Sequence, residues 1–289
     1  MTRIRLGRRL RQGARHVTIS GLAGAQYATG RSTKLLQRPR VHNMYLHAVP
    51  ASEEGSFRSF LDWLKGTGHA FLSYSEGVSM VRSGAIDQPY VTFSFDDGFA
   101  SNLRAARILR EYDTTGCFFV VSGFIGRTDL ADARAFLGRG IAEPAMSWAD
   151  LESLKNEGHE IGNHTRRHRR LSSLARDELE DEIGGSATLL RSRLGCVEHF
   201  AWPFGRFFHF NAEARDLVFA TGHTTCASAE RGAHPAGLPF EDLSKLCLRR
   251  EHIMSEWPLR HSRYFWTRSA LQMKRDEARW PALWDVAQA

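Results

Sequence analysis

Short apolar runs alternate with longer stretches of helical spacing along this 289-residue chain. Runs of β-branched and aromatic residues predict strands, and apolar residues three and four positions apart predict helices. The predicted strands are 41–46, 90–95, 116–121, 160–163, 199–202, 224–227 and 245–249. The predicted helices are 102–112, 148–156, 171–194 and 212–220.

Strands that alternate with helices favour a parallel sheet with the helices outside it, so the pattern predicts an α/β fold. Ser147 and Gly158 are placed to begin and end the helix 148–156. Ser172 and Ser173 are placed to cap the start of the helix that follows. With 42% hydrophobic and 25% charged residues, the chain can bury one large core.

Two adjacent carboxylates, Asp96 and Asp97, end the apolar run 90–95, and Gly98 follows them. Two acids at the end of a buried strand repel each other and are poorly solvated, unless a cation lies between them or one is protonated. Gly98 permits a tight turn that leaves both carboxylates at the end of the strand. The pattern therefore predicts a bound cation.

Two histidines, His164 and His168, follow the predicted strand 160–163. Four-residue spacing lets both imidazoles face one ion, on a helical turn or a bent loop. One carboxylate with two histidines leaves open positions for water and substrate, which suits a catalytic ion, and Asp96 is then free to act as a base. Either motif alone is more often solvated polar surface, but both in this order favour a metal hydrolase.

These segments resemble the polysaccharide deacetylases, that is the NodB-homology or carbohydrate esterase family 4 proteins. The similar stretches lie within 41–255 and are 92–99, 117–120, 146–148 and 158–168. The resemblance implies a distorted (β/α) barrel with the site at the C-terminal ends of its strands. It also implies that Asp96 is the catalytic base and that one divalent metal ion, usually zinc, is held by Asp97, His164 and His168.

A further segment, 200–205, resembles the family motif that forms one wall of the substrate groove. The resemblance assigns Trp202, Pro203 and Phe204 to substrate binding, and it gives the oxyanion to the backbone N–H of Phe204. Many relatives carry an arginine here that orients the base. This chain has Ala201 or Trp202 at that position, as in the branch that resembles poly-N-acetylglucosamine deacetylases.

The cation that replaces the missing arginine is expected on the late strand, where Arg250 or its neighbour Arg249 could hold Asp96 ionised. The proton donor to the leaving amine is less well marked, because the usual late Leu-x-His motif has no clean match. His252 is the candidate, although a lone histidine near a strand end is more often a packing residue. Weaker alternatives are His223, His234 and His209.

The net charge of +7 is unevenly distributed. Residues 1–40 contain ten Lys or Arg and no Asp or Glu, so the remainder carries −3 (7 − 10). We expect a basic N-terminal arm at 1–40, a catalytic domain at 41–255 and a helical extension at 256–289. The arm is expected to be solvated, with contact to an anionic membrane or to phosphate-bearing glycans as the alternative, and no motif for nucleic acid accompanies it.

The arm lacks the continuous apolar core of a secretory signal, and no stretch approaches the ~20 apolar residues of a membrane span. The four cysteines, Cys117, Cys196, Cys226 and Cys247, show no CxxC spacing and are interpreted as reduced thiols. We therefore expect a cytoplasmic protein, peripheral to the inner face of the membrane if the arm binds lipid. An organelle transit peptide is the alternative for the arm.

Three functions follow from the motifs. The first is a metal-dependent hydrolase that removes an N-acyl group, most simply N-acetyl, from an amino sugar in glycan or glycolipid biosynthesis. The second is a sugar deformylase or another non-peptide C–N hydrolase with the same fold. The third is a glycan-binding protein that keeps the fold without the chemistry.

Overall fold

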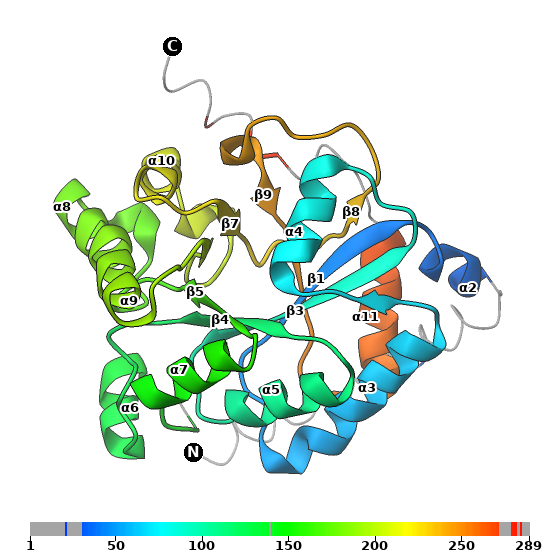
Figure 1. The fold of residues 1–289 in the computed structure, drawn as a ribbon, viewed down its shortest axis with the longest axis horizontal. Coiled ribbons are helices and arrows are strands. Elements are labelled where there is room, and N and C mark those ends of the chain that lie inside the picture. Colours follow the sequence, from blue (N-terminus) through cyan, green and yellow to red (C-terminus); the bar gives the residue numbers. More distant parts are fainter. Residues whose placement is uncertain are drawn as a thin grey trace.

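The computed structural model describes residues 21, 31–138, 140, 142–271, 279–281 and 284, and within them ten strands form one curved sheet (Figure 1). The strands are β1 (Arg40–Leu46), β2 (Ala70–Phe71), β3 (Pro89–Asp97), β4 (Gly116–Val120), β5 (Glu160–Asn163), β6 (His199–Ala201), β7 (Thr225–Ala227), β8 (His234–Pro235), β9 (Cys247–Leu248) and β10 (Arg250–His252). The main path is β10-β1-β3-β4-β5-β6-β7-β9, and every pair on it is parallel. Off this path, β2 pairs parallel with β3 and β8 pairs antiparallel with β1.

The strands β9 and β10 lie at opposite ends of this path, although only Arg249 separates them in the chain. The two edges of the sheet must therefore approach each other, and the sheet curls into the distorted (β/α) barrel that the sequence predicts. The prediction of one strand at 245–249 is wrong, because the chain leaves one edge at β9 and joins the other at β10. This crossing brings Arg250 beside the centre of the sheet.

Helices surround the sheet in Figure 1, with α3 beside α11 on one side and α8, α9 and α10 grouped on the other. The α-helices are α2 (Arg31–Leu36), α3 (Glu54–Gly66), α4 (Tyr74–Ser83), α5 (Asn102–Glu111), α6 (Leu130–Leu137), α7 (Trp148–Asn156), α8 (Arg176–Leu179), α9 (Ser186–Leu194), α10 (Ala212–Ala220) and α11 (Leu259–Leu271). The shorter turns are η1 (Ala51–Glu53), η2 (Leu171–Ser173), η3 (Glu180–Gly185), η4 (Phe207–His209) and η5 (Leu243–Lys245).

Alternation along β3 separates two buried layers. Val91, Phe93 and Phe95 join the large core that the outer helices cover. Tyr90 faces the other way and belongs to a second cluster with residues of β1, β4, β6, β7, β9 and α4. Since successive strand residues point to opposite faces, Asp96 shares the inner face with Tyr90. The barrel interior thus leads directly to the first of the two paired acids.

Most predicted elements match the structure to within a few residues, and those at 148–156, 160–163 and 212–220 match α7, β5 and α10. Ser147 caps α7 in a capping box with Asp150, and Gly158 lies just beyond the helix with a φ of 88°. The long helix predicted at 171–194 is broken into η2, α8, η3 and α9. Ser172 and Ser173 therefore lie in η2, and the N-cap of α8 is Ala175.

Both chain ends add to this picture. Of the predicted arm, residues 1–20 and 22–30 lie outside the described residues, residues 31–36 form α2, and Arg40 begins β1 with a buried side chain. In the C-terminal part, α11 packs on α2 and α3, with Trp266 buried. No helix in the described part of the chain is both long and apolar enough to span a membrane.

Candidate active site

The site forms where neighbouring parallel strands end. Asp96 and Asp97 are the last residues of β3, and His164 follows β5 directly. Because parallel strands end at the same edge of the sheet, these residues meet at the carboxyl end of the barrel. We refer to this end as the mouth.

Asp97, His164 and His168 bring one potential ligand atom each to within 4.8 Å of one another. The Nε2 atoms of His164 and His168 lie 3.6 Å and 3.4 Å from Oδ1 of Asp97. This oxygen is buried and has no hydrogen-bond partner among the described residues. A buried carboxylate oxygen is normally hydrogen-bonded, so an unpartnered one that faces two ring nitrogens fits a divalent metal ion.

The imidazole rings of His164 and His168 are also in forms that can bind a metal. His164 Nδ1 lies 2.7 Å from the carbonyl oxygen of Ala201, to which only an N–H can donate, so Nε2 carries the free lone pair. Burial is the main cause that lowers the pKa of His168, to about 4. At neutral pH this ring is therefore uncharged, which is the form that binds metals.

Backbone strain is concentrated at this site. Among the described non-glycine residues, five have a positive φ, and four of them are Asp97 (76°), Thr165 (69°), His168 (58°) and Phe204 (63°). Such residues persist only where their surroundings enforce them, and they cluster at functional sites. The left-handed backbone at Asp97 breaks the alternation of β3, so that both carboxylates reach the mouth. Gly98 continues the turn with a φ of 89°, as its position in the sequence predicts.

A buried acid holds the loop that carries the two histidines. Glu182 is fully buried in η3, a π-helical turn, and accepts hydrogen bonds from the backbone N–H groups of Arg166 (3.2 Å) and Arg167 (2.8 Å). Beneath the same loop, Asn163 Oδ1 accepts from the N–H of Thr165 at 3.0 Å. These contacts fix the loop between the two imidazoles, and the sequence pattern did not point to Glu182.

The second paired acid has a different partner. Asp96 is 3% exposed and receives two hydrogen bonds from Arg250, 2.7 Å from Nη1 to Oδ1 and 2.9 Å from Nη2 to Oδ2. Burial would raise the pKa of Asp96, but Arg250 and His164 outweigh it and lower this pKa to about 2. Asp96 is therefore ionised across the neutral range, as a base must be.

Arg250 is held on every side. Its Nε donates to the carbonyl of Ser228 at 2.9 Å, and the rings of Tyr45 and Phe119 lie 4.5 Å and 5.1 Å from its guanidinium carbon. Arg249 points elsewhere, since its Nη1 donates to the carbonyl of Arg231 at 3.3 Å. Of the two arginines that the sequence left open, Arg250 is the one beside Asp96.

The predicted groove wall is divided between surface and core. Phe204 is 52% exposed, its ring lies 4.8 Å from that of His168, and within the described chain its backbone N–H donates no hydrogen bond. Pro203 is buried. Trp202 is fully buried and stacks on Phe210 at 4.4 Å, so its indole supports the wall from behind and does not form its surface.

The predicted proton donor, His252, lies at the end of β10 with its ring stacked on Tyr45 at 4.7 Å. Burial, with His47 and Arg231 nearby, lowers the pKa of His252 to about 3. The imidazole is therefore neutral and well packed at neutral pH. This environment suits a structural side chain better than a proton donor.

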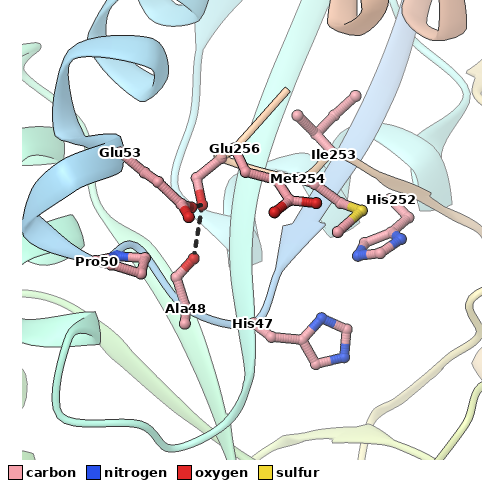
Figure 2. A pocket seen from close by; sticks show the side chains of 9 residues that line it. His47, Ala48, Pro50, Glu53, His252, Ile253, Met254 and Glu256 are labelled. Carbon is pink, nitrogen blue, oxygen red and sulfur yellow. Dashed lines mark hydrogen bonds between the residues drawn. The ribbon is translucent and has the colours of Figure 1, made fainter. Parts of the chain in front are cut away.

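A second histidine at the mouth, His47, was not identified from the sequence. It follows β1 directly, is exposed, and its ring centroid lies 5.3 Å from that of His252. Both rings line one side of a cavity of about 250 Å³, with Pro50 and Glu53 on the other side (Figure 2). His47 is among the groups that affect the pKa of Asp96 and of His168, so it lies near the site. Its position immediately after a predicted strand is the signal that could have found it.

The weaker histidine candidates lie farther from the paired acids. His223 is buried beside Asn163, whose Nδ2 lies 3.2 Å from its Nε2. His234 accepts a hydrogen bond from the N–H of Arg249 at 3.0 Å. His209 lies behind Phe204, with ring centroids 5.1 Å apart. None of the three contacts Asp96 or Asp97 through a hydrogen bond in the described structure.

Comparison with known proteins agrees with this geometry. Residues 83–226, which include both acids and both histidines of the candidate metal site, match the family model for polysaccharide deacetylase. No curated protein sequence matches the chain.

Solved structures share the fold at low sequence identity. IcaB from Ammonifex degensii matches with a TM-score of 0.62 and 20% identity, over 79% of this chain and 98% of that one. The Streptococcus pyogenes deacetylase PplD, solved in complex with acetate, gives 0.61 and 19% over 78% and 97%. A de-N-acetylase from Aggregatibacter actinomycetemcomitans gives 0.58 and 18% over 78% and 98%.

Proposed function

This chain contains a polysaccharide deacetylase domain, and from that premise we propose that it is a metal-dependent hydrolase that removes an N-acetyl group from an amino sugar. The observation that carries the proposal is the buried, unpartnered Oδ1 of Asp97 facing the Nε2 atoms of His164 and His168. The fold alone would not require these three side chains to lie together. A protein that only binds glycans would have no use for a buried, unsatisfied carboxylate oxygen.

Amide hydrolysis needs a polarised carbonyl, an activated water and a proton for the leaving amine. A divalent ion at Asp97, His164 and His168 would polarise the acyl carbonyl and acidify the attacking water. Asp96 takes the proton from that water, and Arg250 keeps this carboxylate ionised and oriented through two hydrogen bonds. The N–H of Phe204 is free to donate to the developing oxyanion.

The proton for the departing amine is assigned to His47 in preference to His252. His47 is exposed at the mouth, whereas His252 is stacked on Tyr45 and has a pKa lowered to about 3. A general acid must hold a proton near the working pH. His252 then serves to pack the strand that positions Arg250.

Product analysis tests the proposal directly. The full-length protein, loaded with zinc, is incubated with N-acetylglucosamine oligomers and the products are followed by NMR. We expect acetate from the wild type and none from Asp96→Asn. Formate release from N-formylated analogues with no acetate would identify a deformylase, and glycan binding without turnover of any substrate would identify a binding protein.

A further inference from the structure

A row of aromatic rings leads outward from the metal site. The ring of Phe204 lies 4.8 Å from His168 and 5.1 Å from His209, which in turn lies 4.1 Å from Phe208. Phe204 is 52% exposed and Phe208 is 71% exposed. Within the described chain only one other large hydrophobic side chain, Leu238, is exposed. The row is therefore an unusual apolar strip on this surface, and it begins at a proposed metal ligand.

The loop beside the strip is rich in arginine. Arg166 and Arg167 both form ion pairs with Asp181, and Arg169 pairs with Glu178 at 2.9 Å. The next residue, Arg170, is exposed and has no carboxylate partner among the residues that the structure describes. Its neighbours in the loop are neutralised by the protein, so its positive charge is left for something else.

Arg170 lies two residues after His168, and Arg206 lies between Phe204 and Phe208 in the chain, so the two arginines belong to the two segments that carry the strip. After burial, these two arginines are the causes that lower the pKa of His209, so both guanidinium groups act on the ring at the centre of the strip. The loops are tied together by a hydrogen bond of 2.9 Å from Ser172 Oγ to the carbonyl of Phe208. Arg206 pairs with Glu230 at 2.8 Å but remains 45% exposed. The strip therefore combines apolar ring faces with nearby positive charge, and a hydrogen bond holds its two loops together.

The cavity beside His47 has an acidic lining. The cavity beside His47 is lined by Glu53 and Glu256, and no arginine or lysine lines it. A substrate that carries an anion next to the reacting sugar would be repelled from this cavity and attracted to Arg170.

We propose that the strip binds the part of the substrate next to the N-acetylated sugar, and that this part is an acidic glycan unit bearing a carboxylate or a phosphate. This inference rests on the proposed function. The C–H faces of the sugar stack on Phe204 and Phe208, and the anion pairs with Arg170, whose planar guanidinium group suits both anions. A membrane surface is disfavoured because the strip begins at His168, where a reacting sugar must lie.

Binding measurements separate this inference from catalysis. Three tetrasaccharides serve as probes: neutral chitotetraose, the same oligomer as its 1-phosphate, and heparosan tetrasaccharide, which carries glucuronate. Their dissociation constants are measured by calorimetry on full-length Asp96→Asn and on metal-stripped wild type, in case the substitution impairs folding. The variants are Arg170→Ala, Arg170→Lys and Phe208→Ala, with Arg107→Ala as the matched control because Arg107 is exposed on α5.

We expect one acidic probe to bind about tenfold more tightly than chitotetraose, as one charge-assisted contact allows. Arg170→Ala should remove this preference, Arg170→Lys should keep part of it, and Arg107→Ala should keep all of it. Phe208→Ala should weaken all three probes. The acidic probe that is preferred identifies the anion as a carboxylate or a phosphate.

Equal affinity for neutral and acidic probes, or equal effects of Arg170→Ala and Arg107→Ala, would overturn the inference. Vesicles of phosphatidylglycerol and phosphatidylcholine that bind the wild type but not Phe208→Ala, without any glycan preference, would show a membrane surface instead. An acidic preference that persists while no probe is deacetylated would support the strip and count against the proposed function alone.

Discussion

Each end of the barrel holds a carboxylate beside histidine, but only the carboxylate at the amino end has its hydrogen bonds satisfied by the protein. At the mouth, Oδ1 of Asp97 faces two imidazoles and accepts no hydrogen bond from the described residues. At the amino end, Glu160 accepts hydrogen bonds from the N–H (3.0 Å) and the Oγ–H (2.6 Å) of Ser75, and its Oε2 lies 2.9 Å from Nε2 of His199. The other nitrogen of His199 lies 2.9 Å from Oγ1 of Thr225.

This difference separates the candidate metal cluster at the mouth from the structural cluster at the amino end. Both clusters pair an acid with histidine, so residue type alone does not separate them, although Glu160 is only half-buried and Ser75 is exposed. At the amino end each polar atom named above already has a protein partner, which stabilises the barrel where β5, β6 and β7 begin. At the mouth Oδ1 of Asp97 lacks a hydrogen bond from any described residue. The free-energy cost of burying this oxygen without a partner is offset only when a cation binds.

The largest expected effect comes from the base. Asp96→Asn should lower kcat by about 10²–10⁴-fold, because it removes the proton acceptor from the water, while the metal ligands remain. Steady-state kinetics with metal analysis of the same sample measures both. A variant with full activity would show that Asp96 is not the base.

The roles of the two histidines at the mouth, His47 and His252, can be distinguished by the next largest effect. His47→Ala should lower kcat by about 10²-fold if it protonates the leaving amine. His252→Ala should mainly lower the melting temperature, because it removes a ring stacked on Tyr45. The reverse pattern, with kcat lost only in His252→Ala, would identify His252 as the proton donor.

Buried neutral histidines should make the fold sensitive to acid. Burial is the main cause that lowers the pKa of His69 and His252 to about 3, and of His159 and His223 to about 4, from 6.5. The unfolded chain therefore binds these protons first, and stability present above pH 6.5 is lost as the pH falls towards 4. Each histidine contributes about 1.4 kcal/mol per pH unit in that range. Urea unfolding at several pH values checks this, and a flat profile between pH 7 and 5 would contradict it.

The smallest effect on activity is expected at the amino end. Glu160→Gln should destabilise the protein by about 1–3 kcal/mol, because an amide cannot accept all the hydrogen bonds that the carboxylate does. Its zinc affinity and kcat should stay at the wild-type values. Thermal unfolding and metal titration of one sample suffice, and a loss of zinc binding would mean that the two ends are not independent.

The grouping of the candidate metal ligands could be predicted from the sequence because its signals are local. Asp97 and His164 lie at the ends of runs that already look like strands, and parallel strands end together. The choice between Arg249 and Arg250 could not be made, because it depends on the crossing from β9 to β10. That crossing is set by closure of the whole sheet and not by any local pattern.

Other parts of the site could not be predicted, because they depend on tertiary packing that the spacing of residues in the sequence does not reveal. Trp202 and Phe204 are two residues apart, yet one is fully buried and the other is half exposed. The role of Glu182 depends on the π-helical turn that carries it under the histidine loop. The cytoplasmic location and the membrane contact of the basic arm stay predictions, which cell fractionation with and without residues 1–30 would check.

The central claim is that Asp97, His164 and His168 form a metal centre, and equilibrium zinc binding to chelator-stripped protein tests it most directly. Wild type is compared with His164→Ala and with Glu160→Gln, which alters the satisfied cluster at the other end. We predict tight binding of one zinc ion to the wild type and to Glu160→Gln, and no tight binding to folded His164→Ala. Equal binding by all three proteins, or none by the folded wild type, would contradict the account.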